Sequence, residues 1–189
     1  MPQTGSDIIK AWPQESREAA QLVISSYGEP HETTESLLLW YGAGPWKRIT
    51  ASRVFFEHRF PTPHIDSVES VIDYQVPVEK FTPLAEFDGS VIVERTAGEV
   101  FARCHDEQAN FLALNLMHVI VTGAKTVEQA RRYYAKEFAD YRRKQPTPYM
   151  DGLQFQPPQD TADPDSRALS DLGLEQAAQE GERKEGSAR

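Results

Sequence analysis

The chain has 189 residues, 39% of them hydrophobic, and its formal net charge at pH 7 is −9. This is ordinary globular usage for about one domain, which excludes collagen-like, fully disordered and disulfide-scaffold chains. The single cysteine, Cys104, allows neither an intramolecular disulfide nor a cysteine-based zinc cage. No segment approaches the ~18 apolar residues that cross a bilayer, and the acidic balance argues against phosphate-backbone binding. We therefore expect a cytoplasmic protein that binds neither membranes nor nucleic acid.

The composition changes near Gln145. Residues 145–189 contain 9 acidic and 4 basic side chains and five prolines, and few of their residues are hydrophobic. Such a segment buries too little apolar surface to offset the entropy of ordering it. We expect a single domain over residues 1–144 and an acidic, Pro-rich, mostly disordered tail over 145–189 that adds little to stability. Within that tail, residues 149–155 are apolar enough to dock on the domain.

The first half of the domain predicts one helix followed by two strands. Pro13 and Gly28 frame a helix over about 13–27, because proline favours the first helical position and glycine the C-terminal end. The apolar runs at 36–41 and 46–56 then predict strands, joined by the glycine-rich turn between them.

The region from Ser16 to Tyr41 combines that helix, the sequence YGEP, a polar stretch and the run LLLWY. In this order of elements it is similar to the helix–GxP–strand unit of small outer-membrane assembly lipoproteins. The resemblance is local, and we take no function from it.

The second half predicts a fold in which strands and helices are segregated. Residues 58–66 contain two prolines and predict an extended connection, 68–76 fit either a strand or a helical turn, and 77–87 fit a short helix or a packed loop. The pattern at 90–104 predicts a hairpin. Two helices follow, over about 106–122 and 127–144, the second with capping-box spacing at its start. We expect an α+β fold: an antiparallel sheet of about four or five strands with helices packed on one face.

His64 and Asp66 are the first candidates for chemistry. In an extended chain, residues two positions apart point the same way, so this imidazole and this carboxylate would project together. A carboxylate beside a histidine fixes its tautomer and suits a catalytic base or a metal ligand. His58 lies upstream on the same connection and is a third candidate ligand. The alternative is that Asp66 caps a turn and that His64 is solvated.

His118 lies on the very apolar helix predicted at 106–122, on a face it shares with Phe111 and Leu114. Either His118 and Asn115 form hydrogen bonds with neighbouring backbone, or this face forms the floor of a pocket where His118 meets His64 or Asp66. His118 is therefore a candidate for both catalysis and metal binding. In either case we expect its imidazole to be neutral at pH 7.

The sequence Cys104-His105-Asp106-Glu107 precedes the same helix. Adjacent residues point apart, so His105 is badly placed as a base for Cys104, which we expect to be a small buried residue. Asp106 and Glu107 are typical first-turn acids that complement the helix dipole.

Two functions from different classes remain. The first is a binding module for a small molecule or a protein, with Trp40, Trp46 and Asn115 as candidate pocket residues. The alternative is a metal-assisted hydrolase that binds a divalent ion through His58, His64, Asp66 and His118. No specific catalytic motif is present, which favours the binding module. The sequence does not settle whether the protein is an enzyme.

Overall fold

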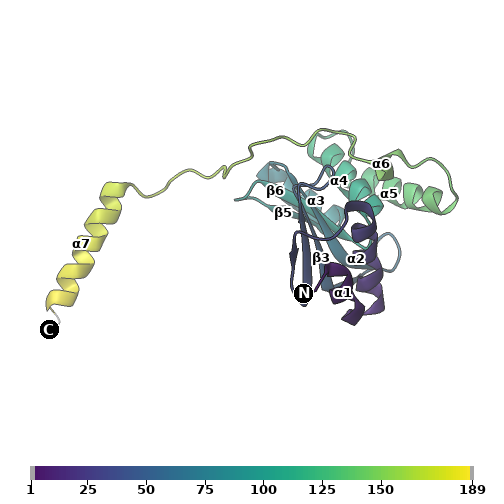
Figure 1. Cartoon of the computed structure of the whole chain (residues 1–189). Helices are drawn as coiled ribbons and strands as arrows, with labels where there is room; N and C mark the ends of the chain where they lie inside the picture. Colours follow the sequence, from purple (N-terminus) through teal and green to yellow (C-terminus); the bar gives the residue numbers. More distant parts are fainter. Residues whose placement is uncertain (1–2, 188–189) are drawn as a thin grey trace.

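The fold is built on one antiparallel sheet. The computed structural model describes residues 3–187 and has six strands in the order β1-β2-β3-β4-β6-β5 (Figure 1). The strands are β1 Glu32–Thr33, β2 Leu37–Tyr41, β3 Arg48–His58, β4 His64–Asp73, β5 Val91–Glu94 and β6 Glu99–Cys104. The α+β prediction is confirmed, with a slightly higher strand count than expected.

Helices precede, interrupt and follow the strands. They are α1 Gly5–Ile8, η1 Ile9–Ala11, α2 Gln14–Tyr27, η2 Val78–Lys80, α3 Phe81–Phe87, α4 Glu107–Val121, α5 Val127–Arg142, α6 Pro148–Asp151 and α7 Asp171–Ser187. Within residues 3–187, no helix is both long enough and apolar enough to cross a bilayer. The helices predicted at 13–27, 106–122 and 127–144 are all present.

The core lies between one face of the sheet and helices α2 and α4. Along each strand, alternate residues point into it, and Trp40, Ile49 and Ile72 are among those that are fully buried. Helix α4 is apolar nearly all round, so it is buried on most of its surface, as such helices must be. Helix α5 is amphipathic and begins with the predicted capping box, in which Thr126 and Gln129 satisfy each other's backbone amides.

Strands β3 and β4 form a hairpin. The prediction that residues 58–66 are an extended connection was therefore wrong. The prolines are confined to the turn at 59–63, so strand pairing continues on both sides of it, with His58 opposite His64. The ambiguous region that follows is a strand as far as Asp73. This hairpin positions the candidate site.

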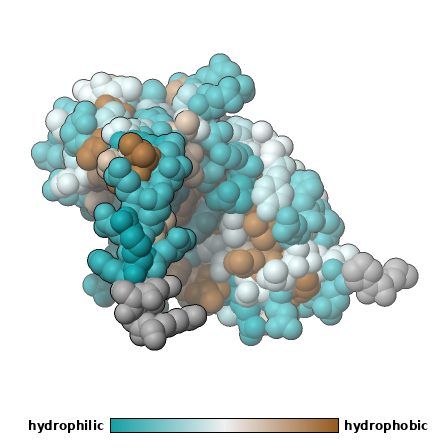
Figure 2. Space-filling model, turned by 90° about the vertical axis from the view of Figure 1, so that its left-hand side faces the viewer, coloured by the Kyte–Doolittle hydropathy of each residue, from teal (hydrophilic) through white to brown (hydrophobic). Residues whose placement is uncertain are grey.

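The packed part of the chain extends beyond the boundary expected at Lys144. Helix α6 lies against α4, and Met150 within it is 2% exposed. Residues 149–155 therefore dock on the domain. Beyond them an extended segment leads to α7, which stands away from the sheet (Figure 1). Helix α7 lies nearest the viewer in Figure 2, and Leu172 and Leu174 within it are exposed. The last two residues of the expected tail lie outside the described residues.

Candidate functional site

Three predicted ligands meet at the β3–β4 hairpin. His58 ends β3 and His64 begins β4 directly opposite, with ring centroids 4.9 Å apart. Asp66 lies two residues along β4 and points the same way as His64, with one oxygen near each ring. Its Oδ2 is 3.3 Å from His58 Nδ1 and its Oδ1 is 3.2 Å from His64 Nε2. One ligand atom from each residue lies within 4.8 Å of the other two, the spacing of a candidate metal site.

The tautomer of His64 follows from its contact with the backbone. Nδ1 lies 2.8 Å from the carbonyl oxygen of Thr62, which can only accept, so Nδ1 carries a proton. In the neutral ring, Nε2 then carries a lone pair, and this lone pair faces Asp66. Burial alone would lower the pKa of His64, but its contacts with Asp66 and the Thr62 carbonyl outweigh burial and raise it.

Asp66 has a buried oxygen without a hydrogen bond. Its side chain is 3% exposed, and Oδ1 accepts no hydrogen bond although His64 Nε2 lies 3.2 Å away. Buried polar atoms are almost always paired, so an orphaned carboxylate oxygen requires an explanation. A lone pair on Nε2 and another on Oδ1 repel each other unless a proton or a cation lies between them.

Asp88 and Ser90, which the sequence analysis missed, complete one side of the cluster. Asp88 Oδ1 lies 3.6 Å from His58 Nε2 and accepts the Ser90 amide at 2.8 Å. The Ser90 hydroxyl donates to Asp66 Oδ2 and lies 3.3 Å from His58 Nδ1. Burial raises the pKa of Asp88, although the Ser90 amide and His58 oppose that change. In the sequence both residues belong to an ordinary turn before β5, and nothing local indicates that they reach the other hairpin.

His105 and Asp106 form a second pair beside His64. His105 Nε2 lies 2.8 Å from Asp106 Oδ2, and the His105 ring is 5.9 Å from that of His64. Asp106 Oδ1 accepts the Ala109 amide at 2.8 Å, so Asp106 is also the N-cap of α4. Burial would raise the pKa of Asp106, but His105 and this cap lower it overall. The expectation that Asp106 is only a helix-terminal acid was therefore incomplete.

Cys104 is buried at the end of β6, as predicted. Burial raises the pKa of its thiol well above the usual value, so the side chain stays protonated. Its Sγ lies 3.5 Å from His105 Nδ1.

The cluster contains more buried negative charge than fixed positive charge. The side chains of Asp66, Asp88 and Asp106 are 3%, 3% and 15% exposed, and none of them pairs with a lysine or arginine among the described residues. Buried carboxylates need a compensating positive charge. Here it can come only from protonated histidines or from a bound cation.

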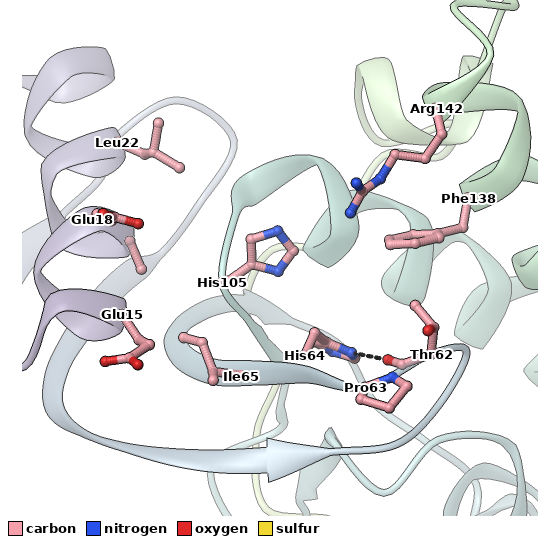
Figure 3. A pocket seen from close by; sticks show the side chains of 11 residues that line it. Glu15, Glu18, Leu22, Thr62, Pro63, His64, Ile65, His105, Phe138 and Arg142 are labelled. Carbon is pink, nitrogen blue, oxygen red and sulfur yellow. Dashed lines mark hydrogen bonds between the residues drawn. The ribbon is translucent and has the colours of Figure 1, made fainter.

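A cavity of about 290 Å³ adjoins the cluster (Figure 3). It lies between α2, the β3–β4 hairpin and the end of α5, and both His64 and His105 line it. His64 thus belongs to the buried cluster and to the cavity wall. A ligand in the cavity would contact the same imidazole that faces Asp66.

The structure does not bring His118 to this cluster. His118 Nδ1 lies 2.8 Å from the hydroxyl of Tyr74, and its ring stacks on Phe155 with centroids 4.2 Å apart. Tyr74 follows the far end of β4, ten residues from His64, which at about 3.3 Å per residue is roughly 30 Å along the strand. Burial lowers the pKa of His118, in agreement with the expected neutral imidazole.

The candidate pocket residues Trp40, Trp46 and Asn115 have core positions. Both tryptophans are 1% exposed; Trp40 donates to the carbonyl of Gly28, and Trp46 donates to Glu107 and stacks on Phe111. Asn115 donates to two backbone carbonyls of the docked segment and accepts the amide of Gln154. None of the three lines the cavity beside His64.

No family model, no curated protein and no solved structure matches this chain. A function must therefore be inferred from the chemistry of the site. The site combines two histidines and a carboxylate at ligand spacing with a histidine–aspartate pair and a small cavity.

Proposed function

We propose that the chain binds one divalent transition-metal ion through His58, His64 and Asp66 and acts as a metal-assisted hydrolase. The observation that carries this proposal is the orphaned Oδ1 of Asp66. It is buried, it has no hydrogen bond, and it faces the one nitrogen of His64 that the backbone leaves free. A cation between them accepts both lone pairs and offsets the buried negative charge.

The donor geometry fits such an ion. Donors about 2.0–2.2 Å from one ion are separated by about 3.0–3.5 Å when they are adjacent ligands. The distance from Asp66 Oδ2 to His58 Nδ1 is 3.3 Å and that from Asp66 Oδ1 to His64 Nε2 is 3.2 Å, so each carboxylate oxygen has one histidine nitrogen in this range. Nitrogen and oxygen donors suit zinc, manganese and iron, and three protein ligands leave positions for water and substrate. Asp88, Ser90 and the Thr62 carbonyl would orient the ligands from behind.

His105 supplies the acid–base chemistry that a hydrolase needs. Asp106 holds its Nε2, so Nδ1, which also lies 3.5 Å from the Cys104 thiol, would be the atom that accepts a proton from the attacking water and returns it to the leaving group. When bound, the ion would lower the pKa of a coordinated water and polarise the substrate carbonyl. His105 and His64 both line the cavity, so the substrate would meet the base and the ion's ligand together.

A non-enzymatic binding module for a small molecule is the second candidate, and the cavity supports it. That function needs the cavity but no ion and no proton transfer. A cytoplasmic location and a small-molecule partner remain parts of the proposal under both functions.

Metal binding is tested on protein stripped with a chelator and then titrated with zinc, manganese and iron(II). We expect one ion per chain and a stabilisation of about 2.7 kcal/mol at a hundredfold excess over Kd. His58→Ala and His64→Ala should each abolish the stabilisation, and the double variant should be no worse because the ligands act as a unit.

His118→Ala is the matched control, since this histidine is remote from the cluster, and it should bind the ion normally. Absence of any bound ion, or an ion that His64→Ala leaves undisturbed, would refute the metal site. Metal binding without hydrolysis of ester, amide or phosphoester substrates would favour the binding module.

A further inference from the structure

The cavity beside His64 has two walls of opposite charge. Glu15 and Glu18 project from α2 on one side, and Arg142 projects from the end of α5 on the other (Figure 3). His64 and His105 lie between them in the same view. A ligand that spans the cavity therefore meets carboxylates at one end and a guanidinium at the other.

These charges have no strong partners within the described part of the chain. Arg142 forms no ion pair there, and its guanidinium lies only over the ring of Phe138, 5.4 Å from the centroid. Glu15 has neither a hydrogen bond nor an ion pair there, while Glu18 accepts only the amide of Gln14 at 2.8 Å. By contrast, Arg132 in the same helix and Arg143 directly after it each pair with an acid. A ligand can engage the cavity charges without breaking an existing ion pair.

The cavity also has an apolar lining and is small. Leu22 lies on α2 with Glu15 and Glu18, and Phe138 lies beside Arg142, so each charged wall also carries an apolar side chain (Figure 3). The cavity's volume of about 290 Å³ lies just below the roughly 300–1,000 Å³ usual for ligand pockets. A compact molecule with one apolar side chain fits these dimensions.

We infer that the cavity binds a small zwitterion of the amino-acid type, and, resting on the proposed function, that the hydrolysed substrate is a dipeptide. The ammonium group of this ligand pairs with Glu15 and Glu18, its carboxylate pairs with Arg142, and its apolar side chain packs against Phe138 beside Arg142. The amide in the middle then lies beside His64 and His105.

The reaction is hydrolysis of the amide by one water molecule. The oxygen of water bonds to the amide carbon, the carbon–nitrogen bond breaks, and the leaving nitrogen takes a proton through His105. The products are two amino acids, and no other reactant is required.

The test measures binding of glycyl-leucine and of its N-acetylated and C-amidated forms by calorimetry, on metal-free and on metal-loaded protein. Blocking either end should weaken binding about three- to tenfold, because each removes one charge-assisted contact. Arg142→Glu should weaken binding of the free dipeptide and leave the C-amide unchanged. Glu15→Gln combined with Glu18→Gln should leave the N-acetyl form unchanged.

Arg132→Glu and Glu128→Gln are the matched controls, because both residues are exposed on α5 and do not line the cavity. Circular dichroism checks that every variant is folded. If end-blocking has no effect, or glycyl-leucine does not bind, the inference fails even where a metal ion binds. If the dipeptide binds with this charge dependence and no ion binds, the cavity assignment holds and the hydrolase proposal fails.

Discussion

At the residue scale, the function of each histidine depends on which ring nitrogen its neighbours already occupy. His64 donates through Nδ1 to a backbone carbonyl and presents Nε2 to Asp66. His105 is held at Nε2 by Asp106, and His118 meets the hydroxyl of Tyr74 at Nδ1. Under the proposed function, the same side chain would be a metal ligand, a base and a structural residue at three positions of one fold.

His118 should make the protein less stable in acid. Burial lowers its pKa in the folded state below the value of about 6.5 in the unfolded chain. Its stabilising contribution is then complete above pH 6.5 or so and is lost as the pH falls through the folded-state pKa. His118→Gln cannot titrate, so it should lose less stability than the wild type between about pH 7.5 and about pH 5. Urea unfolding at both pH values measures this, and equal losses in the two proteins would contradict it.

At the scale of elements, helix α4 holds the core together. Its side chains pack against the sheet on one side and against α5 and α6 on the others. Helices that contact neighbours on most sides depend on tertiary packing far more than on intrinsic propensity. Damage to α4 should therefore affect the whole domain.

Leu114→Ala and Leu116→Ala should each reduce the free energy of unfolding by about 2–5 kcal/mol, because both side chains are fully buried. Denaturant melts with an unchanged m-value would measure the loss. Leu172→Ala in α7 is the control, since that side chain is 63% exposed and should change stability by less than about 0.5 kcal/mol. A loss below about 1 kcal/mol at both α4 positions would show that this helix is not the core.

The sequence predicted those elements whose signals are local. Helices α4 and α5 and the β5–β6 hairpin were evident from periodicity, capping and turn residues. The β3–β4 hairpin was missed because its prolines suggested a break, although they lie only in the turn. Within the site, His64 and Asp66 were found through their two-residue spacing. Asp88 and Ser90 join these two residues only through tertiary structure. For His118, helical periodicity predicts the face of the helix on which it lies but not where along the sheet that face packs.

At the scale of the whole molecule, the docked segment 149–155 is part of the domain. Ending the chain after Lys144 removes buried Met150 and deprives Asn115, which is 1% exposed, of its backbone partners. A buried methionine contributes about 1.5–3 kcal/mol and an unpaired buried polar group costs about 1–3 kcal/mol. At about 2–4 °C per kcal/mol, the melting temperature should therefore fall by about 5–20 °C.

The comparison is a chain that ends after Gln156. It keeps the docked segment and lacks the extended segment and α7, so its melting temperature should be nearly that of the full chain. Scanning calorimetry on the three proteins gives the answer. Equal melting temperatures for the two truncated chains would show that the segment adds nothing, as composition alone had suggested.

Asp106 connects the cavity to the centre of the fold. One oxygen of its carboxylate caps the first turn of α4 through the Ala109 amide, and the other holds His105. A ligand that immobilises His105 therefore also suppresses fraying at the start of α4. Slower amide hydrogen exchange in that turn would then show that the cavity is occupied, whatever the ligand is.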